Sequence, residues 1–432
     1  MAHQDRPHPR LDGKAVAAVV LGNALEFYDF TVYAFFAVPI GEAFFPARDP
    51  TSSLLSSLAL FGIGYVMRPL GGLLIGALAD RAGRKPAMVL TIALMAVGML
   101  MLAVTPGTAV LGWPAQAIVI VGRLVQGLAL GGEVGPSTAY LLEAAPHRHR
   151  GFIASWQIAS QGCAALFAGL VASGLSLAVG EAAMGQWGWR VMVLLGLAVV
   201  PVGLVIRRHL PETAGAGAAD AGAFESMPAV LRGLLRDHGR LLVLTFVVIA
   251  ASTVSNAIGT NMPVYARATL GLTETVSTAV PIALGLASVL FPLLGGWLAD
   301  RAGRRPVMVW PRALIALLCV PAFLWLARQP SAGAVYAVTF LLSALSSVNA
   351  AAIIVAIPES LPRSVRSTGL SLVYALAVSI FGGSTNYVVN KLVAVTGDRL
   401  MPAYYLAAFS VVGTLAALML PETRGRRLDG PA

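Results

Sequence analysis

"GALADRAGRKP" (76–86) recurs almost unchanged as "GWLADRAGRRP" (296–306), so that Asp80 corresponds to Asp300, 220 residues later. Two further matches follow in the same order. "EAAPHRHR" (143–150) corresponds to "ESLPRSVR" (359–366), and "PET" follows an apolar stretch at both 211–213 and 421–423. Three ordered matches at similar spacing predict two repeats of the same topology, each with half of the apolar segments.

The composition around these repeats is that of a membrane protein with many spans. The 432 residues are 57% hydrophobic and 12% charged, whereas about 25% of the residues in a soluble domain are charged. The apolar blocks are long enough to cross a hydrocarbon core of about 30 Å as helices. We therefore predict an all-α membrane protein with twelve transmembrane helices in two parallel six-helix repeats. The predicted spans are 15–45, 53–79, 86–105, 115–145, 150–179, 188–207, 239–266, 276–299, 306–327, 333–361, 366–395 and 402–421.

The net charge of +10 follows the predicted topology. Basic residues gather on one side of the spans, whereas the opposite loops hold few cations. The first side has clusters at 81–85, 148–150, 207–208, 301–305 and 424–427, and the second has Arg48, Arg267, Arg328 and Arg399. Cytoplasmic loops carry such an excess of Lys and Arg. The pattern predicts cytoplasmic termini in a cell inner membrane, and we expect no nucleic-acid partner.

The predicted organisation has five parts. A cytoplasmic tail (1–14) precedes the first six-helix bundle (15–207), a cytoplasmic linker (208–238), the second bundle (239–421) and a second cytoplasmic tail (422–432). The first tail is polar and lacks a cleavable signal. The linker contains "ETAGAGAADAGAFES", with a short helix expected near 225–238. Cys163 and Cys319 lie in separate spans and support neither a disulfide nor a metal site, and we expect no cofactor.

Acids inside the spans are the candidates for proton binding. All six histidines fall outside the predicted spans, and of the acids only Glu26, Asp29 and Glu133 lie well within one. Measured along a helix from Lys14, Glu26 lies at about 18 Å and Asp29 at about 22 Å. These two acids are three residues apart and share a face. Ionisable groups at this depth are costly and usually functional.

Three arginines also lie within predicted spans. Arg68 lies twelve residues before Asp80, and Arg312 falls in the ninth span. Arg123 is the second residue of the stretch "GRLVQGLALGGEVG" (122–135). The planar guanidinium of Arg68 can hold a carboxylate through two hydrogen bonds. We therefore expect Arg68 to be an anchor for an anionic substrate.

The repeated loop resembles the signature loop that follows helices two and eight of the major facilitator superfamily, and the 122–135 stretch is similar to the fourth-helix Arg motif of that superfamily. The resemblance covers the chain from end to end. It implies a transporter with a substrate site between two rocking halves. Asp80 and Arg84, and likewise Asp300 and Arg304, are expected to pair and to stabilise one conformation, so we predict a gating role for them. The alternative is that these residues only mark topology.

Within the superfamily, "GNALEFYDFTVYAFFAVPIGEAFFP" (22–46) and "RPLGGLLIGALADRAGRKP" (68–86) resemble the metabolite:proton symporter family. "GFIASWQIASQ" (151–161) and "FGGSTNYVV" (381–389) are similar to its citrate and tricarballylate members, although Asn386 stands where proline is expected in citrate carriers. The resemblance implies that Asp29 and Arg123 form the proton-coupling pair, with Glu26 and Glu133 as further candidates. A static buried salt bridge is the alternative, and Glu26 has either Arg68 or backbone donors as its expected partner.

Polar residues in the spans suit an anionic substrate. The predicted substrate-binding residues are Arg68, Tyr28, Gln157, Ser160, Gln161, Asn256, Thr260, Asn261, Asn349, Thr385 and Asn386. Amides and hydroxyls also hold membrane helices together, which is the alternative for each of them.

The sequence therefore predicts a proton-coupled symporter that imports a small organic anion, a di- or tricarboxylate such as citrate or tricarballylate, by alternating access. A symporter for proline or betaine, or for another acid such as 2-oxoglutarate or shikimate, is the alternative. We expect no enzymatic activity, because no catalytic cluster lies in the spans. The expected partners are the organic anion, protons and the lipid bilayer, and the protein is expected to be a monomer.

Overall fold

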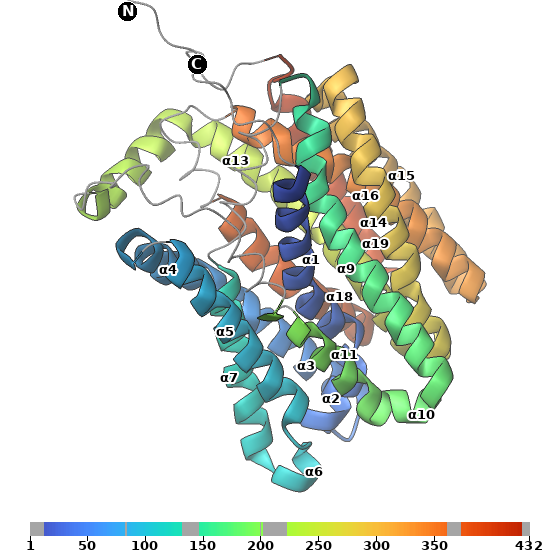
Figure 1. Ribbon diagram of the computed structural model, residues 1–432. Coiled ribbons are helices and arrows are strands. Elements are labelled where there is room, and N and C mark those ends of the chain that lie inside the picture. The colour runs from blue at the N-terminus through green and yellow to red at the C-terminus, as the bar shows by residue number, and fades with distance from the viewer. Residues whose placement is uncertain are drawn as a thin grey trace, which may run out of the picture.

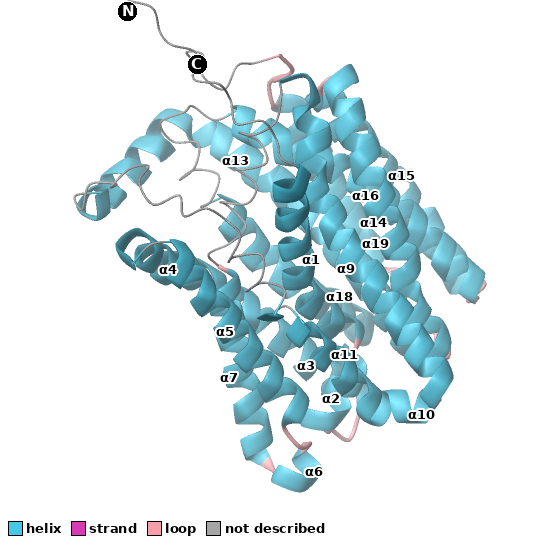
Figure 2. Cartoon of the chain, viewed as in Figure 1, coloured by secondary structure: helices cyan, strands magenta, loops and turns pink. Residues whose placement is uncertain are grey.

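Helices make up almost all of the described protein. The computed structural model describes residues 13–82, 84–131, 147–198, 200–201, 223–360 and 373–425. Within these ranges the helices are joined by short turns and no strand occurs (Figure 2). We call residues 13–201 the first half and residues 223–425 the second half.

The first half holds the elements that carry the candidate acids. Its elements are α1 (Gly13–Phe35), α2 (Ala37–Phe44), α3 (Pro50–Val66), α4 (Arg68–Ala82), α5 (Arg84–Val104), α6 (Thr108–Leu111), α7 (Trp113–Leu130), η1 (His147–His149), α9 (Arg150–Val179), α10 (Glu181–Ala183), η2 (Met184–Gly188), α11 (Trp189–Leu195) and η3 (Gly196–Ala198).

The second half is built from longer helices. Its elements are α13 (Ala223–Val264), η4 (Tyr265–Thr269), α14 (Glu274–Ala302), α15 (Arg304–Arg328), α16 (Ala332–Ser360), η5 (Val378–Gly382), α18 (Gly383–Thr396) and α19 (Met401–Met419). The short helix expected near 225–238 is the beginning of α13, which departs from helical geometry at His238 (φ −128°, ψ 15°) before the span begins.

Eight helices of the described residues are long and apolar enough to cross a membrane. They include α7, α9, α13, α14, α15, α16 and α19, and a helix that joins α3 to the start of α4. The other four predicted spans coincide with α1–α2, α5, η2–α11–η3 and η5–α18, which are interrupted or only partly described. Together these elements account for the twelve predicted spans.

Prolines explain two of the interruptions. Proline has no N–H, and its ring clashes with the carbonyl four residues earlier. Pro39 lies three residues after the break at Phe36 between α1 and α2, and Pro69 lies two residues after the break at Met67 between α3 and α4. The regular helix is therefore interrupted in the first and second spans near residues that carry the candidate site.

The start of α3 shows how a span begins at the aqueous boundary. Asp49 accepts hydrogen bonds from the backbone N–H groups of Thr51 and Ser52, and Pro50 follows it at the first helical position. These are the residue types that favour a helix N-terminus. The hydrogen bond from the Ser52 hydroxyl, and those from the two backbone groups, lower the pKa of Asp49.

The contacts between α1 and α9 fix the direction of both helices. Asn23 of α1 bonds to Gln157 and Ser160 of α9, and five residues further along α1 the ring of Tyr28 contacts Phe167. The paired positions increase together, so the two helices run in parallel. Both therefore begin at the same end of the molecule, which the distribution of basic residues predicts to be cytoplasmic.

Helices of the two halves meet along α9 and α14 over their full length. In Figure 1, α4, α5 and α7 lie on one side of the molecule, and α9 runs beside α14 on the other. Glycines allow this close packing, because a Cβ on Gly162 would collide with the backbone of Ser288 and one on Gly285 with the backbone of Leu166. A second contact joins α3 to α18, where a Cβ on Gly62 would lie 2.7 Å from the carbonyl oxygen of Gly383.

Gly162→Leu should lower the yield of folded protein. The new side chain has no space against α14, and overpacking of this kind costs about 1–3 kcal/mol or more. The fraction of monodisperse protein in size-exclusion chromatography measures the effect. Gly174→Leu is the matched control on the same helix, because nothing lies within 4 Å of its added Cβ. Equal losses in both variants would contradict the packing argument.

Candidate functional site

The carboxylate of Asp29 lies in the middle of the first span and is withdrawn from solvent. Arg123 of α7 approaches it, with 3.3 Å between Arg123 Nη1 and Asp29 Oδ2, and the two side chains are 0% and 2% exposed. The same Nη1 donates to Gln126 Oε1 at 2.7 Å, one turn later on α7. Removing either charge from such a buried pair leaves the other uncompensated, at a cost of about 3–5 kcal/mol.

Aromatic rings surround the Arg123 guanidinium. Its central carbon lies 4.2 Å from the ring centre of Tyr33 and 4.8 Å from that of Phe30. Arg68 lies against the same phenylalanine, with its central carbon 4.6 Å from the Phe30 ring centre and 4.0 Å from that of Tyr65. Cation–π attraction holds each guanidinium in place. The single ring of Phe30 therefore contacts both cations.

Arg68 differs from Arg123 in that it has no acidic partner among the described residues. It is 8% exposed, and its Nε has no hydrogen-bond partner. No carboxylate of the described side chains forms an ion pair with it within 4.0 Å. A buried guanidinium that remains uncompensated is costly. No described side chain accepts a hydrogen bond from the Arg68 guanidinium, which suits it to hold an anion that arrives from outside the protein.

Gln157 and Ser160 are tied to α1 through Asn23, a residue not predicted from the sequence. Asn23 Nδ2 donates to Ser160 Oγ at 2.6 Å and to the Gln157 carbonyl at 3.2 Å, and Gln157 Nε2 donates to Asn23 Oδ1 at 2.9 Å. All three side chains are buried. Asn23 lies two turns before Asp29 in the same stretch, so a search of that stretch for amides as well as acids would have found it.

In the second half, Arg312 gathers its own polar partners. Its Nη1 donates to the Ala251 carbonyl at 2.9 Å and to the Ser255 hydroxyl, and its Nη2 donates to Asn349 Oδ1. Asn349 in turn donates to the Met308 carbonyl. Asn349, which we predicted to bind substrate, thus connects α15 and α16, and the contacts that it makes are those of a packing residue.

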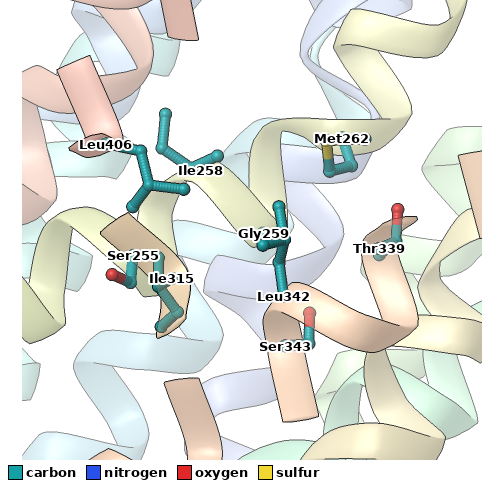
Figure 3. A pocket seen from close by; sticks show the side chains of 9 residues that line it. All are labelled: Ser255, Ile258, Gly259, Met262, Ile315, Thr339, Leu342, Ser343 and Leu406. Atoms are coloured by element: carbon teal, nitrogen blue, oxygen red, sulfur yellow. The ribbon is translucent and has the colours of Figure 1, made fainter. Parts of the chain in front are cut away.

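A small cavity lies beside this cluster, between α13, α15, α16 and α19 (Figure 3). Its volume of about 10 Å³ has room for roughly one water molecule. Apolar side chains make most of its wall, and Ser255, Thr339 and Ser343 contribute hydroxyls. The cavity is too small for a carboxylate substrate.

Hydrogen bonds between asparagine residues connect α13 to α18. Asn390 Nδ2 donates to Asn261 Oδ1 at 2.9 Å and to the Asn386 carbonyl at 2.7 Å. Asn386 and its neighbour Thr385 are buried, and Asn386 Oδ1 has no partner among the described atoms. Two of the predicted substrate residues, Asn261 and Asn386, are therefore joined through Asn390.

The remaining predicted substrate residues have varied surroundings. Tyr28 is buried, and its hydroxyl donates to the Met192 carbonyl of α11 at 3.0 Å. Gln161 is half-buried, and Asn256 is exposed. Thr260 is half-buried and donates to the Ala257 carbonyl of its own helix. Of this group, Gln161, Asn256 and Thr260 are accessible.

At the predicted cytoplasmic end, Asp300 of the second half caps α9 of the first. Its Oδ1 accepts from the Gly151 N–H at 2.9 Å, and its Oδ2 accepts from the Phe152 N–H at 3.0 Å. The first N–H groups of a helix have no partner within the helix and attract a negative charge. Arg304 Nη1 also lies 3.0 Å from Asp300 Oδ1, as the sequence spacing predicts.

Glu359 extends this contact into a buried network, which we call the latch and define as Asp300, Arg304, Glu359 and Arg150. Glu359 Oε2 lies 3.2 Å from Arg304 Nε, and its Oε1 lies 3.2 Å from Arg150 Nη1. Thr423 of the second "PET" donates to Glu359 Oε2 at 2.8 Å. Because Arg150 belongs to the first half, the latch joins the two halves.

Glu422 of the same "PET" caps α15. Its carboxylate accepts from the backbone N–H groups of Arg304 and Arg305, and from those of Thr423 and Arg424. Partial burial acts to raise the pKa of Glu422, but the four backbone donors outweigh it and lower the pKa. The repeated "PET" thus has a physical role in the second half, where it fastens the chain end to the signature loop.

A second carboxylate cap lies at the opposite end of α9. Glu181 Oε1 accepts from the Thr275 N–H at 3.0 Å and from the Thr275 hydroxyl at 2.6 Å, at the beginning of α14. These bonds lower the pKa of Glu181. Here a first-half carboxylate caps a second-half helix, the reverse of the arrangement at Asp300.

Glu359→Gln should destabilise the folded protein strongly. It leaves two buried guanidiniums without their shared carboxylate, a change that costs about 3–5 kcal/mol. Thermal unfolding of the purified protein measures the effect. Glu42→Gln is the control, because Glu42 is exposed on α2. A melting temperature for Glu359→Gln that matches that of the control would mean that the latch adds no stability.

The structure does not describe the side chains of four predicted site residues. Glu133 lies outside the described residues, and so do the side chains of Glu26, Asp80 and Arg84. Their predicted roles in proton coupling and gating stay predictions.

Known proteins resemble this chain over nearly its whole length. It is 33% identical to the citrate-proton symporter of Salmonella typhi over 94% of this chain and 93% of that protein. It is 33% identical to the alpha-ketoglutarate permease of Escherichia coli (strain K12) over 96% and 95%, respectively. The proline/betaine transporter of Salmonella typhimurium is 31% identical, over 96% of this chain and 85% of that protein.

Solved structures agree with the fold. A crystal structure of a D-xylose-proton symporter matches with a TM-score of 0.76 at 19% identity, over 95% of this chain and 98% of that one. The partially occluded inward-open form of the xylose transporter XylE from E. coli matches with a TM-score of 0.72 at 17% identity, over the same shares. The family model of the Major Facilitator Superfamily matches residues 19–385 and 244–428. The predicted fold is thereby confirmed, and the chain belongs to the Major Facilitator Superfamily.

Proposed function

We propose that the protein is a proton-coupled symporter that imports a small organic anion, a di- or tricarboxylate such as citrate or tricarballylate. The observation that carries the proposal is the buried pair of Asp29 and Arg123 beside Arg68, a second buried cation that has no acidic partner among the described side chains. A titratable acid and an uncommitted anion site thus share one region. The protein would act as a monomer in the cell inner membrane with both termini in the cytoplasm, and not as an enzyme.

Proton coupling follows from the charges of this region. While Asp29 is ionised, Arg123 is neutralised and Phe30 contacts both guanidiniums. Protonation of Asp29 removes its attraction for Arg123 and leaves an excess positive charge near Arg68. An anionic substrate compensates that charge, so that proton and anion favour each other's binding. This is a coupling free energy, and it is reciprocal.

Alternating access requires contacts between the halves that exchange during transport. The latch is such a contact, because Arg150 and the α9 N-terminus of the first half bond to Glu359 and Asp300 of the second. We propose that the latch holds the conformation seen here and opens when the halves rock.

The substrate class has one serious alternative. Relatives of almost equal identity are named for citrate, for alpha-ketoglutarate and for proline and betaine. Asn386, which stands in place of the proline expected of citrate carriers, also leaves room for a different substrate. We favour an anion because no described carboxylate pairs with Arg68, whereas a zwitterion brings its own positive charge.

Uptake into proteoliposomes tests the proposal. Labelled citrate, tricarballylate, 2-oxoglutarate, shikimate, proline and betaine would each be offered with an imposed inward proton gradient, with and without an uncoupler. We expect accumulation of at least one carboxylate that the uncoupler abolishes. Accumulation of proline or betaine alone would establish the alternative, and uptake that is insensitive to the uncoupler would exclude proton coupling.

A further inference from the structure

A groove of about 290 Å³ lies on the surface at the predicted cytoplasmic end, between the start of α9 and the end of α14. Its lining comes from both halves of the protein and consists of Arg148, His149, Phe152, Trp297, Asp300 and Arg301. The groove is separate from the region around Asp29, and neither the proton-coupling pair nor the anion site uses it.

The charge that the groove presents is positive. Arg148, His149 and Arg301 are exposed. Asp300 is the one acid of the lining, and its two oxygens are already engaged by the N–H groups of α9 and by Arg304. Among the described residues, the exposed arginines therefore face no uncommitted carboxylate in the groove, and an external anion can approach them.

Aromatic side chains form the apolar part of the groove. Trp297 is 41% exposed and Phe152 is 36% exposed. The Arg301 guanidinium lies 4.2 Å from the Trp297 ring, one turn further towards the helix end. Tryptophan with its apolar ring in the bilayer and its polar edge at the headgroups is typical of a membrane interface. The groove thus combines cations on the aqueous side with apolar surface on the membrane side.

We propose that this groove binds the headgroup of an anionic phospholipid from the adjacent leaflet. Arg148 and Arg301 would bind the phosphate, and Trp297 and Phe152 would contact the glycerol and the first acyl carbons. The position favours a lipid over a soluble anion, because Phe152 lies two residues inside α9 and Trp297 lies five residues before the end of α14. Basic pockets between helices on the cytoplasmic side are suited to such headgroups.

Native mass spectrometry of the full-length protein tests the site. The protein would be purified in detergent and titrated with phosphatidylglycerol or, for comparison, with phosphatidylcholine. Each arginine near an anionic headgroup contributes about fivefold in binding. Arg148→Ala combined with Arg301→Ala should therefore weaken the tightest phosphatidylglycerol binding by about twenty-five-fold and leave phosphatidylcholine binding unchanged.

Further variants test whether a loss of phosphatidylglycerol binding is specific to the groove. Arg240→Ala removes an exposed arginine of α13 near the same end of the molecule and should bind phosphatidylglycerol as the wild type does. Trp297→Leu keeps both cations and should weaken lipid binding to a smaller extent. Unchanged binding in the double variant, with an intact size-exclusion profile, would overturn the site. Competition by glycerol phosphate at the same concentration as the lipid would overturn the lipid assignment in favour of a soluble anion.

Discussion

Asp29→Asn should abolish substrate accumulation while leaving exchange intact. The amide has almost the same shape but cannot carry a proton, so the gradient can no longer drive the cycle. A gradient equivalent to 100 mV corresponds to about 2.3 kcal/mol per coupled charge, or roughly fifty-fold accumulation. We expect the ratio of internal to external substrate to fall to about one, which uptake by proteoliposomes with an imposed gradient measures.

The control and the second readout separate coupling from folding. Glu42→Gln removes an exposed acid from the same predicted span and should accumulate substrate as the wild type does. Counterflow, in which labelled substrate exchanges for unlabelled substrate without a gradient, should persist in Asp29→Asn. Full proton-driven accumulation by Asp29→Asn would remove Asp29 from the coupling role and leave Glu26 and Glu133 as candidates.

Arg68→Lys should weaken anion binding more than any other conservative change at the site. Lysine keeps the charge but loses the planar fork that holds a carboxylate through two bonds, and it stacks less well on Tyr65 and Phe30. Charge-assisted hydrogen bonds contribute about 1.5–3 kcal/mol each. The apparent KM for the transported carboxylate should therefore rise about ten- to a hundred-fold, as initial uptake rates measure.

Arg190→Lys is the matched control for this change. Arg190 also lies over an aromatic ring, 4.2 Å from that of Trp189, and it donates to backbone carbonyls of Gln186 and Thr105. Arg190 lies among first-half residues that are not assigned to the substrate. The KM of Arg190→Lys for the transported carboxylate should therefore stay close to that of the wild type. An unchanged KM in Arg68→Lys, or equal increases in both variants, would place the anion site elsewhere.

The fold was predictable because its determinants are periodic or repeated. Apolar blocks of membrane length predict the spans, and the duplicated loop around Asp80 and Asp300 predicts two halves. The asymmetry of basic residues predicts the orientation in the membrane, which stays a prediction. These features do not depend on which face of a helix meets which neighbour, and each is carried by many residues at once.

The pairing of Asp29 with Arg123 was implied by the resemblance to the superfamily, and the structure brings the two side chains together. A charge that is alone in a membrane is also costly, so it demands a partner. Neutral residues carry no such demand. Tyr28 contacts Met192, and Asn349 contacts Arg312, because the rotation of their helices directs them there. Helix rotation depends on packing between distant segments, which a single sequence does not reveal.

The helix breaks and the latch also show the difference between local features, which the sequence reveals, and contacts between distant segments, which it does not. Pro39 and Pro69 are visible in the sequence, but the sequence does not show where along the helix each proline interrupts the backbone hydrogen bonds. The predicted span 333–361 places Glu359 near the end of a helix. Its contact with Arg150 crosses 209 residues of chain and appears only when the two halves are assembled.

The carboxylate caps at the two ends of α9 and α14 restrict how these helices can move against each other. Asp300 holds the beginning of α9, and Glu181 holds the beginning of α14. The helices run antiparallel, so these bonds sit at opposite ends of the pair. Translation along the common axis in either direction would stretch bonds at both ends. Sliding would therefore break both caps at once, whereas rocking that opens the latch breaks only the cap at Asp300.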